Sequence, residues 1–200
     1  MRSMMAPLIA ATALTVASAP TAVAQDSYQH PCASGPARAF DFWVGDWVVF
    51  DTNTGVVQGI DRIEKINDGC ALFQDWRQMT DRFRAPGAPN RYAGISLSSV
   101  IPGGGWQQVW VGVGGGTITV TGGLDEDGTM VLESAPATAQ NGQTFKRKWH
   151  WDTKPDSTVH SWGEIRTQNE DGSWSDPTVP WDIQYVRRSV SPNLVAAPAN

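Results

Sequence analysis

This chain of 200 residues has few cysteines and histidines and no excess of positive charge. Each of these features argues against a class of function. The two cysteines, Cys32 and Cys70, lack converging histidines and make a poor zinc site. The formal net charge is -5. Because nucleic-acid-binding modules carry a concentrated basic face, we expect no nucleic-acid partner. The sequence motifs of serine hydrolases, phosphate-binding loops and zinc proteases are also missing. We therefore predict no metal site and no cofactor.

Long apolar runs are confined to the N-terminus. Arg2 supplies a positive charge, residues 6–17 are mostly small and apolar, and Ala22-Val23-Ala24 fits a signal-peptidase site. Residues 1–24 are thus predicted to be a signal peptide, with an uncleaved anchor as the alternative. The apolar stretch is too short for a lasting anchor. We expect an exported protein, periplasmic or extracellular, without a stable membrane anchor; the oligomeric state is not indicated.

The two cysteines fit such a compartment, where thiols oxidise. We predict a disulfide between Cys32 and Cys70, which would tie a lead-in of residues 25–39 to the rest of the domain. Two inert buried thiols or a metal pair are the alternatives. The C-terminal residues 190–200 are small and include proline, so we expect a disordered tail.

Helical periodicity is lacking beyond the leader, whereas turn residues divide the chain at short intervals. The hydrophobic content of 40% is enough for one folded domain, which we place at residues 40–189. After a first strand within 40–50, strands are expected near 56–66, 70–79, 91–100, 106–113, 117–121, 129–133, 144–151, 158–167 and 182–188. We predict an all-β fold, an antiparallel up-and-down β-barrel of about ten strands. A two-sheet sandwich is the alternative fold.

The stretch from Phe40 to Phe50 contains Gly45-x-Trp47 before a β-branched and aromatic run. Glycine lets the backbone pass close to the indole, and Arg187 near the other end could lie across the Trp47 ring. A Gly-x-Trp opening, many short strands and a late arginine together resemble the lipocalin and calycin superfamily. The resemblance implies that the last strand closes on the first, with Gly45, Trp47 and Arg187 as structural residues.

A fuller pattern resembles a bacterial secreted lipocalin-like family of unassigned function. Its parts are Phe40-Asp41-Phe42-Trp43-x-Gly45-x-Trp47, Asp68-Gly69-Cys70-Ala71-Leu72 and Gln107-Gln108-Val109-Trp110-Val111. Members of that family often carry a glutamate where this chain has Gln74, and an aspartate where it has Gly112. Both departures remove interior acid, so we carry over no catalytic residue.

Alternation along the strands predicts which side chains face the interior. On 144–151, Phe145, Arg147, Trp149 and Trp151 share one face, while the lysines and His150 take the other. On 158–167 the assignment is less distinct, and we expect Trp162 and Glu164 inside. The predicted ligand-binding residues are Gln74, Trp76, Gln108, Trp110, Arg147, Trp149, Trp162, Glu164 and Tyr185.

Tryptophan walls with a few polar groups favour binding of a small hydrophobic or aromatic ligand, and Arg147 could fix an anionic group. One alternative is a carboxylate-based isomerase or hydrolase that uses Glu164 with Tyr185 or Arg147. A lesser alternative is a haem-binding barrel with His160 as the iron ligand. In a further alternative the tryptophans only fill the barrel and Arg147 pairs with Glu164. These alternatives stay open at the level of sequence.

Overall fold

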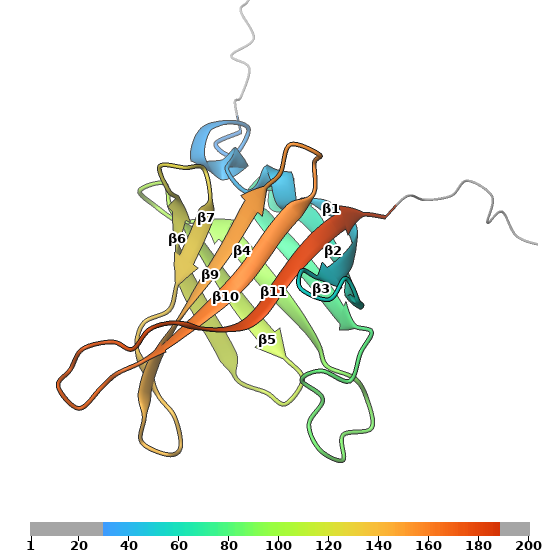
Figure 1. Cartoon of the computed structure of the whole chain (residues 1–200). Coiled ribbons are helices and arrows are strands. Elements are labelled where there is room, and N and C mark those ends of the chain that lie inside the picture. The colour runs from blue at the N-terminus through green and yellow to red at the C-terminus, as the bar shows by residue number, and fades with distance from the viewer. Residues whose placement is uncertain (1–29, 189–200) are drawn as a thin grey trace, which may run out of the picture.

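A computed structural model describes residues 30–188, and its strands wrap around one axis (Figure 1). The strands are β1 (Gly45–Asp51), β2 (Val57–Ile66), β3 (Ala71–Gln78), β4 (Ala93–Val100), β5 (Trp106–Gly112), β6 (Thr117–Leu124), β7 (Met130–Glu133), β8 (Ala137–Thr138), β9 (Thr144–Thr153), β10 (Val159–Thr167) and β11 (Thr178–Arg187). Three short 3-10 helices are η1 (Gly35–Arg38), η2 (Asp41–Trp43) and η3 (Asn67–Gly69).

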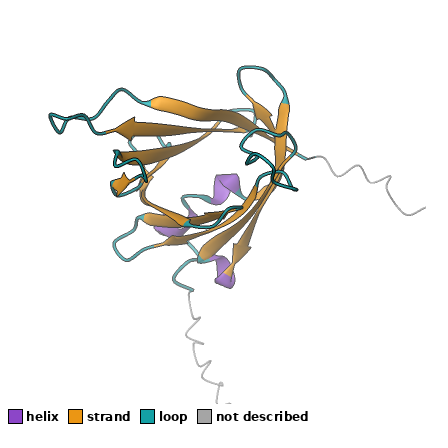
Figure 2. Cartoon of the chain, turned by 90° about the horizontal axis from the view of Figure 1, so that it is seen from below, coloured by secondary structure: helices purple, strands orange, loops and turns teal. Residues whose placement is uncertain are grey.

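Ten of the strands form a closed antiparallel ring. Each strand pairs with its neighbours along the chain, β7 pairs with β9, and β11 returns to pair with β1. The two-residue β8 only extends the edge beside β9. Figure 2 shows the ring from below, with the helices at its far end. The predicted up-and-down barrel of ten strands is confirmed, and the sandwich alternative is wrong.

The end of the barrel at the start of β1 is closed by aromatic side chains. Phe40 and Trp43 are fully buried, and their rings stack with centroids 5.0 Å apart. Trp151 packs on both rings, at 5.1 Å from Phe40 and 5.4 Å from Trp43. The first part of the opening stretch is therefore 3-10 helix that forms a floor, and the strand begins only at Gly45.

Closure of the ring depends on the residues that the Gly-x-Trp pattern singled out. Trp47 pairs in register with Arg187, whose guanidinium carbon lies 4.4 Å from the Trp47 ring centroid. The same guanidinium donates a hydrogen bond to the Val44 carbonyl oxygen at 3.0 Å. Gly45 has φ +152, and a Cβ there would clash with the Arg187 guanidinium. Glycine is thus required where the first and last strands meet.

The predicted disulfide is present. Cys32 and Cys70 are bonded, and their Cα atoms lie 5.1 Å apart. The bond joins the segment before η1 to the residue that follows η3, so that the floor is fixed to the β2–β3 turn.

Some expectations fall outside the described residues. The signal peptide of residues 1–24, the first part of the lead-in and the tail of 190–200 lie beyond 30–188. Within 30–188, no helix has the length and apolar character needed to cross a membrane.

Candidate functional site

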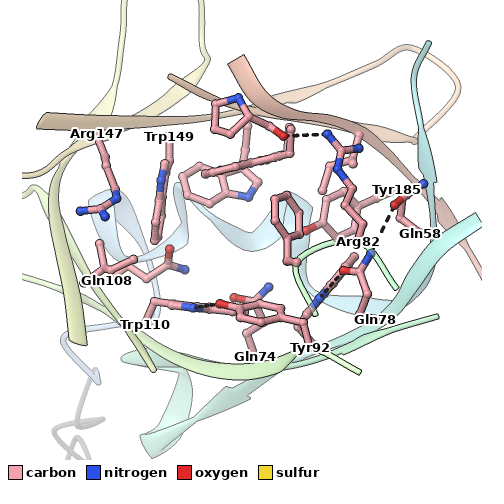
Figure 3. A pocket seen from close by; sticks show the side chains of 18 of the residues that line it. Gln58, Gln74, Gln78, Arg82, Tyr92, Gln108, Trp110, Arg147, Trp149 and Tyr185 are labelled. Carbon is pink, nitrogen blue, oxygen red and sulfur yellow. Dashed lines mark hydrogen bonds between the residues drawn. The ribbon is translucent and has the colours of Figure 1, made fainter. Parts of the chain in front are cut away.

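The barrel encloses a cavity of about 330 Å³, drawn in Figure 3. Its walls are mainly apolar, and six of the chain's ten tryptophans line it: Trp43, Trp76, Trp110, Trp149, Trp151 and Trp181. The wide ring of ten strands leaves this space because inward side chains from opposite walls do not meet.

Four of the polar side chains that line the cavity are glutamines: Gln58, Gln74, Gln78 and Gln108. Gln108 donates from its amide nitrogen to the hydroxyls of Ser96 and Ser98, at 3.1 and 2.9 Å. The Ser96 hydroxyl donates to the side-chain amide oxygen (Oε1) of Gln74 at 2.8 Å, and the side-chain nitrogen of Gln74 donates to Asp61 at 2.6 Å. The wall across β2, β3, β4 and β5 is therefore a continuous hydrogen-bonded network with fixed side chains.

Asp61 ends this network and is a buried acid that sequence reasoning missed. Its Oδ2 accepts hydrogen bonds from Gln74 and from the Tyr185 hydroxyl, the latter at 3.2 Å, while Oδ1 has no partner among the described residues. Burial raises the pKa of Asp61 to about 7. Burial also raises the pKa of Tyr185, with a further contribution from Asp61. The sequence does hold one indication of this position. Asp61 is two residues before Ile63 on β2, and alternate residues of a strand face the same side, so both lie on the inward face.

The cavity opens at the end opposite the aromatic floor. Arg82 and Phe83, from the segment 80–90 between β3 and β4, line it, and the Phe83 side chain is half exposed. Arg82 donates to Asp51 Oδ2 at 2.8 Å and to the Pro180 carbonyl oxygen at 2.7 Å. These two bonds tie the 80–90 segment, which lies between β3 and β4, to the neighbouring strands β1 and β11.

Arg147 is the second cation that lines the cavity. Figure 3 shows its guanidinium beside Trp149 and facing Gln108. The guanidinium carbon lies 4.5 Å from the Phe145 ring centroid, and burial lowers the pKa of Arg147. Within residues 30–188, no carboxylate forms an ion pair with it.

Seven of the nine predicted ligand-binding residues line this cavity together: Gln74, Trp76, Gln108, Trp110, Arg147, Trp149 and Tyr185. Whether they bind a ligand stays a prediction.

The predicted inward orientation of Trp162 and Glu164 is wrong. On β10 the cavity is lined instead by Ser161 and Ile165. Between these two, Gly163 leaves room for the Trp181 ring of β11, against which any Cβ would clash. Ser161, Gly163 and Ile165 thus form the inward face of β10, and the Trp181 ring of the neighbouring strand fills the space beside Gly163.

On the outer face, Trp162 stacks between two imidazoles, 4.4 Å from the His150 ring and 4.7 Å from the His160 ring. Glu164 lies 3.4 Å from His150 Nε2 and 3.8 Å from Arg166. His160 pairs with Asp182 at 2.8 Å. Glu164 therefore does not pair with Arg147, and His160 is not placed to ligate an iron inside the barrel.

One group of possible metal ligands occurs among the described residues: His30, Cys32 and Cys70 lie within 4.8 Å of one another. Because both sulfurs belong to the disulfide, that bond explains the grouping.

The fold and the cavity together define a closed up-and-down β-barrel of lipocalin-like architecture. No protein-family model matches the chain, and no curated protein matches it significantly.

Proposed function

We propose that this protein is an exported lipocalin-like barrel that binds a small hydrophobic or aromatic molecule in its cavity. The observation that carries the proposal is the cavity itself, which has about 330 Å³ of space, walls of tryptophan and a few polar groups held in a network. Small-molecule sites are typically of this size and composition.

Export and family membership are parts of the same proposal. The disulfide between Cys32 and Cys70 suits an oxidising compartment, as the leader-like residues 1–24 would require. The Gly45-x-Trp47 opening and its contact with Arg187 support a place in the bacterial secreted lipocalin-like family that the sequence resembles.

The carboxylate-based enzyme has less support than the binder. Its expected acid, Glu164, lies outside the barrel, and no aspartate or glutamate is among the described residues that line the cavity. Asp61 lies behind Gln74 and Tyr185 and accepts hydrogen bonds from both of them.

Filling the cavity tests the proposal. Ile118 on β6 lines the cavity, whereas the next residue, Thr119, is exposed outside. Binding of the neutral fluorescent probe N-phenyl-1-naphthylamine should be saturable in the unchanged protein. Its affinity should fall at least about tenfold in Ile118→Trp, since the indole occupies the space. Thr119→Trp should bind as the unchanged protein does.

Circular dichroism verifies that both variants are folded. Absence of saturable binding in the unchanged protein, or equal binding in Ile118→Trp, would contradict the proposal.

A further inference from the structure

Among the described residues, the charged side chains that line the cavity are both arginines. Among the described residues that line it, the only ionisable groups with a full charge at neutral pH are Arg82 and Arg147. Arg82 is neutralised by Asp51 and also bonded to the Pro180 carbonyl oxygen. The cavity therefore presents one cation that lacks an acidic partner, and it offers no carboxylate to an ammonium group.

The lysines on either side of Arg147 have acidic partners, whereas Arg147 has none among the described residues. Lys146 and Lys148 point outward from the same strand, and both pair with Glu133, at 2.6 and 3.2 Å. Arg147 points inward between them, and within residues 30–188 it contacts the Phe145 ring and forms no ion pair. A half-buried guanidinium without an anion loses hydration that no ion pair offsets. An anionic ligand would supply the missing partner.

The strand register places Arg147 at the open end. It pairs with Ile165 of β10, which pairs with Thr178 of β11, and two residues further on is Pro180, the residue bonded to Arg82 at the opening. A charged group on the ligand could thus reach Arg147 without crossing the aromatic interior. Because it would stay partly in contact with water, the charged group of the ligand would lose less hydration free energy on binding.

The inward positions of β9 then define where the rest of the ligand lies. Trp149 follows Arg147, and Trp151 comes next, in contact with the aromatic floor. Arg147 and Trp151 are four positions apart on the strand, a distance of about 13 Å. The space alongside is apolar and suits one or two rings or a chain of similar volume. A cavity of about 330 Å³ is near the lower limit for small-molecule sites, which favours a compact body over a sterol.

We infer that the cavity takes a small aromatic or apolar monocarboxylate, with its acid group on Arg147 at the open end and its rings against Trp149 and Trp151. The guanidinium fork matches a carboxylate with two hydrogen bonds. One unpaired cation balances a monoanion, whereas a phosphate monoester dianion would remain half neutralised. This inference rests on the proposed binding function and names its ligand class.

The test compares probes of one shape and different charge by isothermal titration calorimetry of the full chain. The probes are 2-naphthoate, neutral 2-naphthamide and 2-naphthyl phosphate. The unchanged protein should bind 2-naphthoate at least about tenfold more tightly than 2-naphthamide, and 2-naphthyl phosphate no more tightly than 2-naphthoate. Equal affinity for acid and amide, or tighter binding of the phosphate, overturns the inference without any variant being needed.

Arg147→Met and Arg166→Met form a matched pair, because Arg166 lies next to this site on β10 but pairs outside with Glu164. Both substitutions remove one positive charge. The preference for 2-naphthoate over 2-naphthamide should disappear in Arg147→Met and persist in Arg166→Met. A preference that survives in Arg147→Met overturns the inference. If none of the three naphthalene probes binds the unchanged protein while N-phenyl-1-naphthylamine does, the inference is overturned and the binding function stands. If N-phenyl-1-naphthylamine does not bind either, the proposed binding function itself fails.

Discussion

The guanidinium carbon of Arg187 lies 4.4 Å from the centroid of the Trp47 ring, which joins the last strand of the barrel to the first. Arg187→Met should lower the free energy of unfolding by about 0.5–2 kcal/mol, because it removes this cation–π contact and the bond to the Val44 carbonyl. Urea unfolding measures the change. Arg188→Met is the control, because Arg188 is exposed and its replacement removes the same positive charge. Equal losses in the two variants would show that the contact is not stabilising.

Gly45 is expected to be less tolerant of substitution than most other glycines of the barrel. Gly45→Ala should destabilise by about 1–3 kcal/mol, because the added Cβ meets the Arg187 guanidinium at a backbone conformation that favours glycine. Gly123→Ala on β6 should be nearly neutral, since a Cβ there meets nothing within 4 Å. Thermal unfolding of the two variants decides the matter. A Gly45→Ala protein as stable as Gly123→Ala would be inconsistent with this role.

The disulfide closes a loop with a sequence separation of 38 residues. Replacing Cys32 and Cys70 with serine should lower the free energy of unfolding by about 3–4 kcal/mol, because the unfolded chain gains the freedom that the bond removed. Chemical denaturation of both forms provides the measurement. Mass spectrometry after alkylation, without reduction, should find no free thiol in the unchanged protein. Alkylated cysteines, or equal stability of both forms, would argue against a stabilising bond.

Asp61 makes stability depend on pH. Its pKa is 3.8 in an ordinary environment and about 7 in the folded barrel, chiefly because of burial, with Asp75 raising it slightly further. The folded state therefore keeps a proton that the unfolded chain loses, and stability falls as pH rises from about 4 to about 7. The full effect is on the order of 4 kcal/mol. Asp61→Asn retains an oxygen that can accept hydrogen bonds from Gln74 and Tyr185, and it should remove this component.

Urea unfolding at several pH values between 4 and 8 tests that prediction as the difference between Asp61→Asn and the unchanged protein. Taking the difference cancels other groups, such as His150, whose pKa is lowered by burial and which acts in the opposite sense below pH 6.5. Asp46→Asn, which removes an exposed acid on β1, is the matched control for the loss of one carboxylate. A difference between Asp61→Asn and the unchanged protein that stays constant with pH would show that Asp61 titrates normally.

Much of the fold could be predicted from the sequence because local signals agree with it. The Gly45-x-Trp47 pattern and Arg187 indicated closure, and turn residues gave the number of strands in the ring. On β9 the inward face was evident, since lysines and His150 occupied the opposite positions. Alternation predicts the inward face of a strand where one face is plainly more polar than the other.

Two parts of the site were not predicted from the sequence, and in both cases the contacts that stabilise them are with another strand. On β10 both faces carry polar and aromatic residues, and the fit of Trp181 over Gly163 determines which face turns inward. Asp61 is stabilised in the interior by Gln74 and Tyr185, which are distant in sequence. The floor was also not predicted: Phe40 and Trp43 lie in and next to a 3-10 helix at the end of the barrel, before the first strand begins.

The central claim is that the cavity holds a small molecule when the protein is prepared from its native compartment. Native mass spectrometry of the exported protein, followed by denaturing mass spectrometry of the same sample, tests this most directly. The proposal predicts an added mass that is retained under gentle ionisation, released on unfolding and depleted in Ile118→Trp but not in Thr119→Trp. Only the bare chain mass in the native spectrum, together with no saturable binding of hydrophobic probes, would contradict the claim.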